Sequence, residues 1–194
     1  MNRLERLLLH LGSRTPREVH DPLRRQAAVA LLLVPAPDRL LLIRRADRLG
    51  DPWSGHLALP GGRQEPADAS LLETAIRETA EEVGIALDAA QRVAQLDDLA
   101  PMTPQLPPIT VRPYVFRLDM APEVRPNVEV AAHHWVPLAT LAATGALGPA
   151  ELEVGGTRRQ VEGYALPGGL LWGMTERILT PVVRAWATAP PPDD

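Results

Sequence analysis

The sequence predicts an α/β fold in which a mixed β-sheet lies between helical layers. Segments with strand-like hydrophobic patterns occur both early and late in the chain, and two longer helical patterns lie between and after them. No repeat of fixed period and no linker-like stretch divides the 194 residues. We therefore expect one domain over residues 1–194, with a helical extension at residues 1–25 and a disordered tail at residues 189–194.

The expected strands follow from local hydrophobic patterns. Gln26 to Val34 is almost continuously apolar, which is typical of a strand buried on both faces, and a turn at Pro35–Asp38 leads to its neighbour. A later short strand runs into Pro60-Gly61-Gly62, where we expect a tight turn. The expected strands are residues 26–34, 39–44, 56–59, 92–99, 110–118 and 130–136, followed by a hairpin of residues 151–154 and 158–162 around Gly155-Gly156.

The expected helices are residues 1–11, 71–83, 138–144 and 172–186. The second of these carries apolar residues at spacings of three and four, can be capped by Asp68 or Ser70, and ends at Gly84. The last contains Pro181, which we expect to kink or split it.

Composition excludes several kinds of chemistry. All 20 basic residues are arginine and cysteine is absent, which rules out a Schiff-base or P-loop lysine, a thiolate nucleophile, a cysteine zinc site and a disulfide framework. The net charge of −4 argues against nucleic-acid binding. The longest apolar run, residues 27–34, is too short to span a membrane, and Glu5 interrupts the N-terminal apolar stretch, so it does not resemble a signal peptide. We expect a cytoplasmic protein.

Glutamates crowd the expected helix of residues 71–83. Glu78, Glu81 and Glu82 share one helical side, where like charges repel unless a cation lies among them. Carboxylate oxygens suit Mg²⁺ or Mn²⁺. A solvated acidic face, with Arg77 paired to Glu81, is the alternative for the glutamates alone. The preceding glycines favour a metal–phosphate site instead, since Gly61 or Gly62 can bring a carbonyl to a metal or an amide to a phosphate.

These motifs resemble the Nudix box, G-x5-E-x7-R-E-U-x-E-E-x-G-U. The run R-E-T-A-E-E-V-G-I from Arg77 to Ile85 matches every fixed position of its second half. In the first half, Gly62 keeps the family spacing to Asp68, but Asp replaces Glu and the stretch from Asp68 to Arg77 is one residue longer. We place this extra residue in the loop or first helical turn, where it weakens any role for Asp68. The resemblance implies a Nudix-type α/β/α sandwich.

A narrower resemblance points to the coenzyme A pyrophosphatase branch of this family. The run L-L-I-R-R-A from Leu41 looks like its L-L-T-x-R-[SA] segment, and G-H-L-A-L-P-G-G from Gly55 looks like its G-x-x-x-F-P-G-G segment. The run W-G-M-T-E-R-I-L from Trp172 also occurs there. Ile43 and Leu59 depart from this pattern and keep other substrates open.

The resemblance implies a Mg²⁺- or Mn²⁺-dependent hydrolase of a small-molecule nucleoside diphosphate linked to another group, with coenzyme A cut to 3′,5′-ADP and 4′-phosphopantetheine as the first expectation. ADP-ribose, dinucleotide polyphosphates or nucleoside triphosphates are alternatives, and a non-catalytic Nudix nucleotide-binding domain is a third. Glu78, Glu81, Glu82 and the carbonyl of Gly61 are the implied metal ligands, and Glu78 is also implied as a base when it is not fully committed to the metal. Arg77 is implied to orient a helix carboxylate, whereas Arg44, Arg45 and Gly62 are assigned to the substrate.

Other polar residues leave alternatives open. Glu65, Glu123 and Glu129 lie in or near expected loops, and the sequence cannot choose which one supplies a distal ligand or base. A structural hydrogen bond is the simpler interpretation of His56. His133 and His134 are adjacent in a strand and should face opposite sides, which makes a shared metal improbable. Trp53 and the prolines of residues 101–108 could line a substrate pocket or pack in loops, and the N-terminal helix could serve a homodimer contact.

Overall fold

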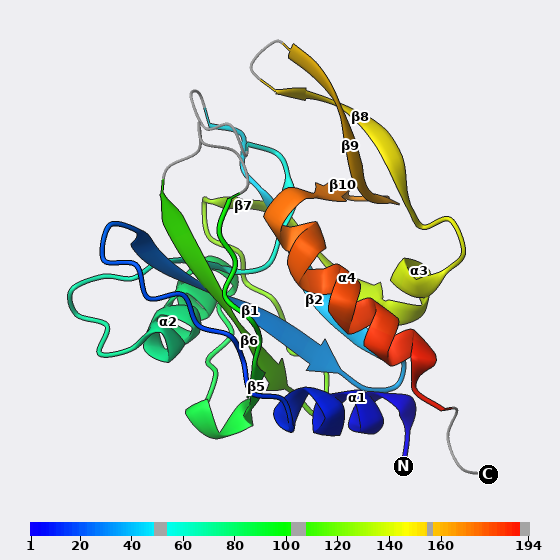
Figure 1. The fold of residues 1–194 in the computed structure, drawn as a ribbon, viewed down its shortest axis with the longest axis horizontal. Coiled ribbons are helices and arrows are strands. Elements are labelled where there is room, and N and C mark those ends of the chain that lie inside the picture. The colour runs from blue at the N-terminus through cyan, green and yellow to red at the C-terminus, as the bar shows by residue number, and fades with distance from the viewer. Residues whose placement is uncertain (49–53, 102–107, 155–156, 191–194) are drawn as a thin grey trace.

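The computed structural model of the chain describes residues 1–48, 54–101, 108–154 and 157–190. A seven-stranded sheet lies at the centre and a three-stranded sheet projects beside it (Figure 1). The central sheet contains β1 (Arg25–Val34), β2 (Arg39–Arg45), β3 (Leu57–Ala58), β4 (Gly61–Arg63), β5 (Arg92–Gln95), β6 (Ile109–Arg117) and β7 (Val130–Pro137). The smaller sheet contains β8 (Leu147–Val154), β9 (Thr157–Leu166) and β10 (Gly169–Trp172).

The central sheet is mixed. The strand order is β3-β2-β1-β6-β5, with β4 also paired to β1 and β7 also paired to β2. β1 and β6 run parallel, whereas the other pairings are antiparallel. Because a strand points successive side chains to opposite faces, the apolar run of β1 supplies both cores: Leu31 and Leu33 face one, Ala30 and Leu32 the other.

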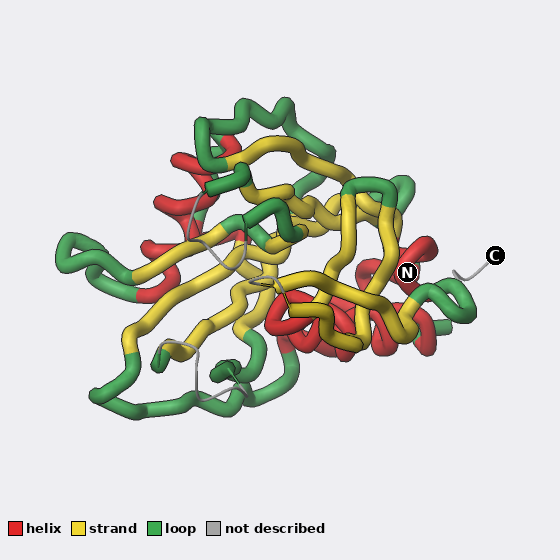
Figure 2. The backbone as a smooth tube through the Cα atoms, turned by 90° about the horizontal axis from the view of Figure 1, so that it is seen from above, coloured by secondary structure: helices red, strands yellow, loops and turns green. Residues whose placement is uncertain are grey.

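Helices cover both faces of this sheet (Figure 2). The helix α2 (Leu71–Val83) packs on the face that carries Ala30 and Leu32. The helices α1 (Arg3–Gly12), α3 (Leu138–Ala142) and α4 (Gly173–Thr188) contribute to the core on the opposite face. The predicted α/β fold with a mixed sheet between helices is therefore confirmed.

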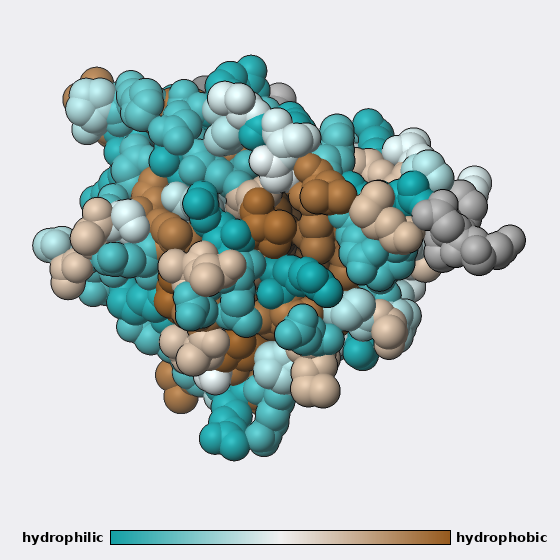
Figure 3. Space-filling model, turned by 90° about the horizontal axis from the view of Figure 1, so that it is seen from below, coloured by the Kyte–Doolittle hydropathy of each residue, from teal (hydrophilic) through white to brown (hydrophobic). Residues whose placement is uncertain are grey.

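The first and last helices meet in the second layer. Asn2 and Glu5 form a capping box at the start of α1, which buries Leu4, Leu7, Leu8 and Leu11. The guanidinium of Arg3 lies 4.8 Å from the ring centroid of Trp186 in α4. Seen from below, the molecule shows apolar residues in the middle of its face and polar residues around them (Figure 3).

The segment between α1 and β1 is attached by acidic side chains near β5. The buried carboxylate of Asp98 accepts the Nε–H and Nη2–H of Arg112, each at 2.8 Å, and the backbone N–H of Val19 at 2.8 Å. Arg112 also pairs with Glu18 at 3.0 Å, and Asp97 accepts the N–H of Arg17 at 2.9 Å. These bonds hold residues 13–24 against the sheet.

Several predicted boundaries were wrong. Gly61 and Gly62, expected only in a turn, lie in β4, because Gly61 pairs with Val29 and Gly62 with Ala28. Pro181 lies inside α4 without splitting it. The late hairpin is longer than expected on both sides, and β10 adds a third strand.

Some predictions fall outside the described residues, namely those on Trp53, most of the proline-rich loop, the Gly155-Gly156 turn and the final four residues of the tail. Within the described part of the chain, no helix is both long and apolar enough to cross a membrane.

Candidate active site

The helix α2 positions the glutamates. Its first turn is capped by Ser70, whose Oγ accepts the N–H of Glu73 at 3.2 Å, and its last turn ends at Gly84 with φ 69°, a left-handed conformation that glycine adopts without strain. Burial of Thr79 and Val83 fixes the rotation of the helix against the sheet. This rotation directs Glu82 inward.

Glu82 is the most buried of these carboxylates, with only 4% of the residue exposed. Its Oε2 accepts the N–H of Gly61 at 2.9 Å, so the end of α2 is joined directly to β4. Burial raises the pKa of Glu82 to about 7, although the Gly61 hydrogen bond and the charge of Arg45 oppose this shift. The negative charges of Glu78 and Glu129 raise the pKa of Glu82 further.

Glu78 lies against the next residue of β4. A Cβ at Gly62 would collide with the Glu78 carboxylate, so the absence of a side chain there makes the space for that carboxylate. Burial raises the pKa of Glu78, Arg77 opposes the shift, and Glu81 and Glu129 add to it. The two glycines therefore bring Glu78 and Glu82 to the same strand.

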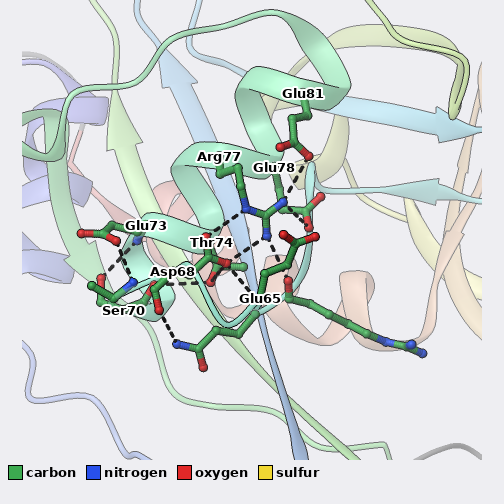
Figure 4. Close-up of polar contacts among 11 residues, drawn as sticks. Glu65, Asp68, Ser70, Glu73, Thr74, Arg77, Glu78 and Glu81 are labelled. Carbon is green, nitrogen blue, oxygen red and sulfur yellow. Dashed lines mark hydrogen bonds and ion pairs between the residues drawn. The ribbon is translucent and has the colours of Figure 1, made fainter.

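Arg77 binds four oxygen-bearing groups (Figure 4). Its Nε and Nη2 donate to Oδ1 and Oδ2 of Asp68, each at 2.9 Å, and its Nη1 donates to Glu78 and Glu81, each at 3.1 Å. Nη2 also donates to the carbonyl of Arg63 at 3.1 Å. The expected pairing of Arg77 with a helix carboxylate is confirmed, but its bidentate partner is Asp68.

Asp68 therefore has a larger part than the sequence indicated. Its Oδ2 also accepts the N–H of Glu65 and the hydroxyl of Thr74, each at 2.9 Å. The hydrogen bonds from Arg77 hold the pKa of the Asp68 carboxyl well below its usual range. The prediction that the extra residue weakens any role for Asp68 was wrong, because the loop of residues 64–70 places its carboxylate on Arg77.

Glu129 is the loop glutamate whose charge acts on this group. Its negative charge raises the pKa of both Glu78 and Glu82, whereas neither Glu65 nor Glu123 has this effect among the causes resolved for them. The loop before β7 brings it there, since Asn127 donates its N–H to the carbonyl of Glu82 at 2.9 Å. Nothing in the sequence pattern distinguishes Glu129 from the other two, because this placement depends on the pairing of distant segments.

Arg44 and Arg45, the two residues assigned to the substrate, have different surroundings. The charge of Arg45 lowers the pKa of Glu82. Arg44 is exposed and donates its Nε–H to the carbonyl of Gly55 at 3.3 Å. A bulge between them interrupts the pairing of β2 with β7 and accounts for their divergence.

The histidines lie elsewhere. The ring of His56 meets that of Trp172 edge-on, with centroids 5.2 Å apart. His133 pairs with Ile43 and His134 with Leu42, so they face opposite sides of the sheet, as expected. His134 lines a cavity of about 190 Å³ between β7 and the β9–β10 turn.

A cavity of about 400 Å³ lies near the start of α2, lined by Gln26, Leu71, Arg112 and residues 19–22. The arginine in its wall is already paired with Asp98 and Glu18. The glutamates of α2 do not line this cavity, so their chemistry belongs to a separate surface site.

The donor set fits a hard divalent cation, although the carboxylates are not gathered around one point. Among the described residues, no three His, Cys, Asp or Glu side chains form a ready coordination group, because Arg77 holds Glu78 and Glu81 while Gly61 holds Glu82. However, the charge of Glu129 raises the pKa of both Glu78 and Glu82, the charge of Glu78 raises that of Glu82 further, and Glu82 is buried. A divalent cation with oxygen ligands would relieve this repulsion.

Comparison with known proteins agrees with this geometry. A family model described as the NUDIX domain matches residues 24–153. An uncharacterized Nudix hydrolase, NudL, from Photorhabdus laumondii is 32% identical over 165 residues, which cover 84% of this chain and 86% of that protein. An uncharacterized protein from Schizosaccharomyces pombe is 43% identical over 107 residues, which cover 53% of this chain and only 32% of that protein.

A solved structure of the same family has a similar fold. The crystal structure of a MutT/nudix family protein from Enterococcus faecalis has a TM-score of 0.59 and 18% identity, over 94% of this chain and 67% of that one. Since the family model covers most of the chain and the Photorhabdus relative aligns over most of both proteins, the chain belongs to the Nudix family.

Proposed function

We propose that the chain is a divalent-metal-dependent pyrophosphohydrolase of a nucleoside diphosphate linked to another group. One observation carries this proposal: Glu78 and Glu82 are held side by side against Gly62 and Gly61 of β4, where their charges repel and one of them is buried. Such an arrangement costs stability in the metal-free protein and favours a bound cation. A binding module without catalysis has no need of it.

In this proposal Glu78, Glu81, Glu82 and the carbonyl of Gly61 hold Mg²⁺ or Mn²⁺. When bound, the metal neutralises the diphosphate and activates water. Arg77 keeps Glu78 and Glu81 in place through its bonds to Asp68, which is a positioning role.

Glu129 is assigned the base. The oxygen of water bonds to one phosphorus, the bond from that phosphorus to the bridging oxygen breaks, and the proton goes to a carboxylate oxygen of Glu129. Three features support this choice: Glu129 is half-buried, its charge acts on Glu78 and Glu82, and it lies on a loop bonded to α2.

The substrate proposed first is coenzyme A or a derivative, on the sequence resemblance that begins at Leu41 and Gly55. The charge of Arg45 acts on Glu82, and its guanidinium is suited to a phosphate oxygen of the diphosphate, as is the glycine strand at Gly62. Arg44, exposed at the end of β2, is proposed for a phosphate farther from the scissile bond.

The test is a substrate panel with purified protein and Mn²⁺ or Mg²⁺. Coenzyme A, its thioesters, ADP-ribose, diadenosine polyphosphates and nucleoside triphosphates are ranked by kcat/KM, and products are identified by mass. We expect coenzyme A to rank first and to yield 3′,5′-ADP and 4′-phosphopantetheine. If another substrate ranks first, the proposed hydrolysis of a diphosphate still stands but the coenzyme A assignment is overturned. If no diphosphate is hydrolysed, the proposed function itself is overturned.

A further inference from the structure

The backbone of Glu129 is anchored to two neighbours. Residues 125–127 extend along the end of α2, where Arg125 donates its N–H to the carbonyl of Val83 at 2.8 Å and Asn127 donates to that of Glu82 at 2.9 Å. Asn127 Oδ1 accepts the N–H of Glu129 at 2.8 Å, and the carbonyl of Glu129 accepts the N–H of Ala46 at 2.7 Å. These bonds fix the main chain and leave the direction of the Glu129 side chain to be set by another contact.

Arg48 supplies that contact. Its Nη2 donates to Oε1 of Glu129 at 2.7 Å, a short charge-assisted bond. The side chains of Arg48 and Glu129 are 49% and 44% exposed, so water screens the pair and it adds little to stability. The main consequence of the bond is therefore the orientation of the carboxylate.

Arg48 is itself held in place. Its N–H donates to the hydroxyl of Ser54, and that hydroxyl lies 3.4 Å from the carbonyl of Ala46 and 3.3 Å from that of Arg48. Ala46 is also the residue bonded to the main chain of Glu129. Arg48 thus reaches Glu129 from a backbone that is tied to Glu129, which makes a closed ring of contacts.

We propose that Arg48 is a positioning residue that directs the Glu129 carboxylate toward Glu78 and Glu82, and so sets the rate at which Glu129 takes the proton of the attacking water. This inference rests on the proposed function. It assigns Arg48 no contact with substrate, because its guanidinium already binds the carboxylate it orients.

The experiment is a double-mutant cycle of Arg48→Ala and Glu129→Gln, with Arg125→Ala as the matched control. Arg125 forms a similar but more exposed surface pair with Glu123 at 2.9 Å, with side chains 76% and 73% exposed. We expect Arg48→Ala to lower kcat about tenfold with KM unchanged, and to have less than a twofold effect, roughly, in the Glu129→Gln background. Arg48→Lys, which keeps the charge without the planar fork, should recover part of the loss.

Mn²⁺ alone gives a second readout. Loss of a positive charge near the carboxylates should tighten Mn²⁺ binding about twofold in Arg48→Ala, while the thermal midpoint stays the same. A role limited to holding the loop together would instead weaken Mn²⁺ binding and lower the midpoint together. Arg125→Ala should change neither quantity.

Failure of the positioning role of Arg48 can be distinguished from failure of the proposed hydrolase function. Additive effects in the cycle, or a rise in KM that persists in Glu129→Gln, overturn the positioning role. Looser Mn²⁺ binding in Arg48→Ala also overturns it. A wild type that hydrolyses no diphosphate contradicts the proposed function and, with it, the effect of Arg48 on the rate. Tighter Mn²⁺ binding by Arg48→Ala would in that case still support the placement of Arg48 beside the carboxylates.

Discussion

The carboxylate of Glu78 occupies the space in which a side chain of Gly62 would begin. The first polar group that a methyl at position 62 meets is the far end of a flexible side chain, and the backbone of Gly62 does not have a positive φ. The glycine is therefore a requirement of the site more than of the fold.

Gly62→Ala should lower kcat/KM about 100-fold, because a displacement of about 1 Å in a catalytic carboxylate is enough for such a loss. The thermal midpoint should change little. Gly148→Ala is the control, since nothing lies within 4 Å of a Cβ at that position. Steady-state kinetics of both variants check the prediction, and an unaltered rate in Gly62→Ala would contradict the placement of Glu78.

Asp68 should stabilise the protein at neutral pH and lose that effect in acid. Its pKa is lowered in the folded state, so its contribution is present above the unfolded value of about 4 and disappears as the pH falls through the folded value. Asp68→Asn should lower the free energy of unfolding by about 2 kcal/mol at pH 7, with the gap to wild type closing below about pH 4.

Denaturant unfolding at several pH values measures this gap. Asp119→Asn is the control, because that side chain is 98% exposed and lies 4.0 Å from Arg117. An Asp68→Asn deficit that is the same at pH 3 and pH 7 would show that the bonds to Arg77 are not its cause.

Glu82→Gln should stabilise the metal-free protein while abolishing activity. The pKa of Glu82 is raised to about 7 in the folded state, so the wild type loses stability as the pH rises from the unfolded value toward about 7. Glutamine escapes this loss and can still accept the Gly61 hydrogen bond. The expected gain above pH 7 is about 3 kcal/mol, because the pKa rises from 4.5 to about 7 and each unit of pKa shift corresponds to about 1.4 kcal/mol.

Thermal unfolding in a chelator, from pH 5 to pH 9, checks this prediction. The advantage of Glu82→Gln should grow from pH 5 to just above pH 7, level off at higher pH, and shrink when Mn²⁺ is added, since the metal binds the wild type better. Glu162→Gln, at an exposed position of β9, should give a difference that does not vary with pH. A Glu82→Gln variant less stable than wild type at pH 8 would argue against burial as the cause of the shift.

Asp98→Ala should destabilise the fold without touching the site. The buried carboxylate accepts two bonds from Arg112 and one from Val19, and its loss leaves the guanidinium with Glu18. We expect a loss of about 3–5 kcal/mol, with faster hydrogen exchange in residues 13–24. Asp97→Asn is the control and should have a smaller effect, because that carboxylate is 36% exposed. At a temperature where Asp98→Ala stays folded, its kcat should equal that of wild type, and a lower kcat would contradict a purely structural role.

The local parts of the fold could be predicted because short-range signals determine them. The run at Gln26 to Val34, the cap at Ser70 and the stop at Gly84 all lie where the pattern indicates. Pairing partners could not be predicted: nothing local says that β1 lies parallel to β6 or that Gly61 pairs with Val29. That last pairing turned an expected turn into a strand. Pro181 did not break α4, whose buried side chains stabilise the helix on both sides of it.

The same division holds for the site. The sequence alone predicts that Glu78 and Glu82 lie on one side of a helix, and it also reveals their resemblance to a known motif. Asp68 was misjudged because its role depends on the path of a loop, which carries no periodic signal. Glu129 was one of three equal candidates in the sequence, and its charge effect on Glu78 and Glu82 is what favours it for the proposed role.

The contact of Arg3 with Trp186 has a consequence for how the molecule is made. The helix α1 is synthesised before α4, and it carries four leucines that α4 helps to cover. The sheet can begin to form while that surface is still open to other chains, and the second layer closes only after α4 has been made. Nascent chains that stall before residue 173 should therefore be the ones that aggregate, even though every glutamate of α2 has already been made.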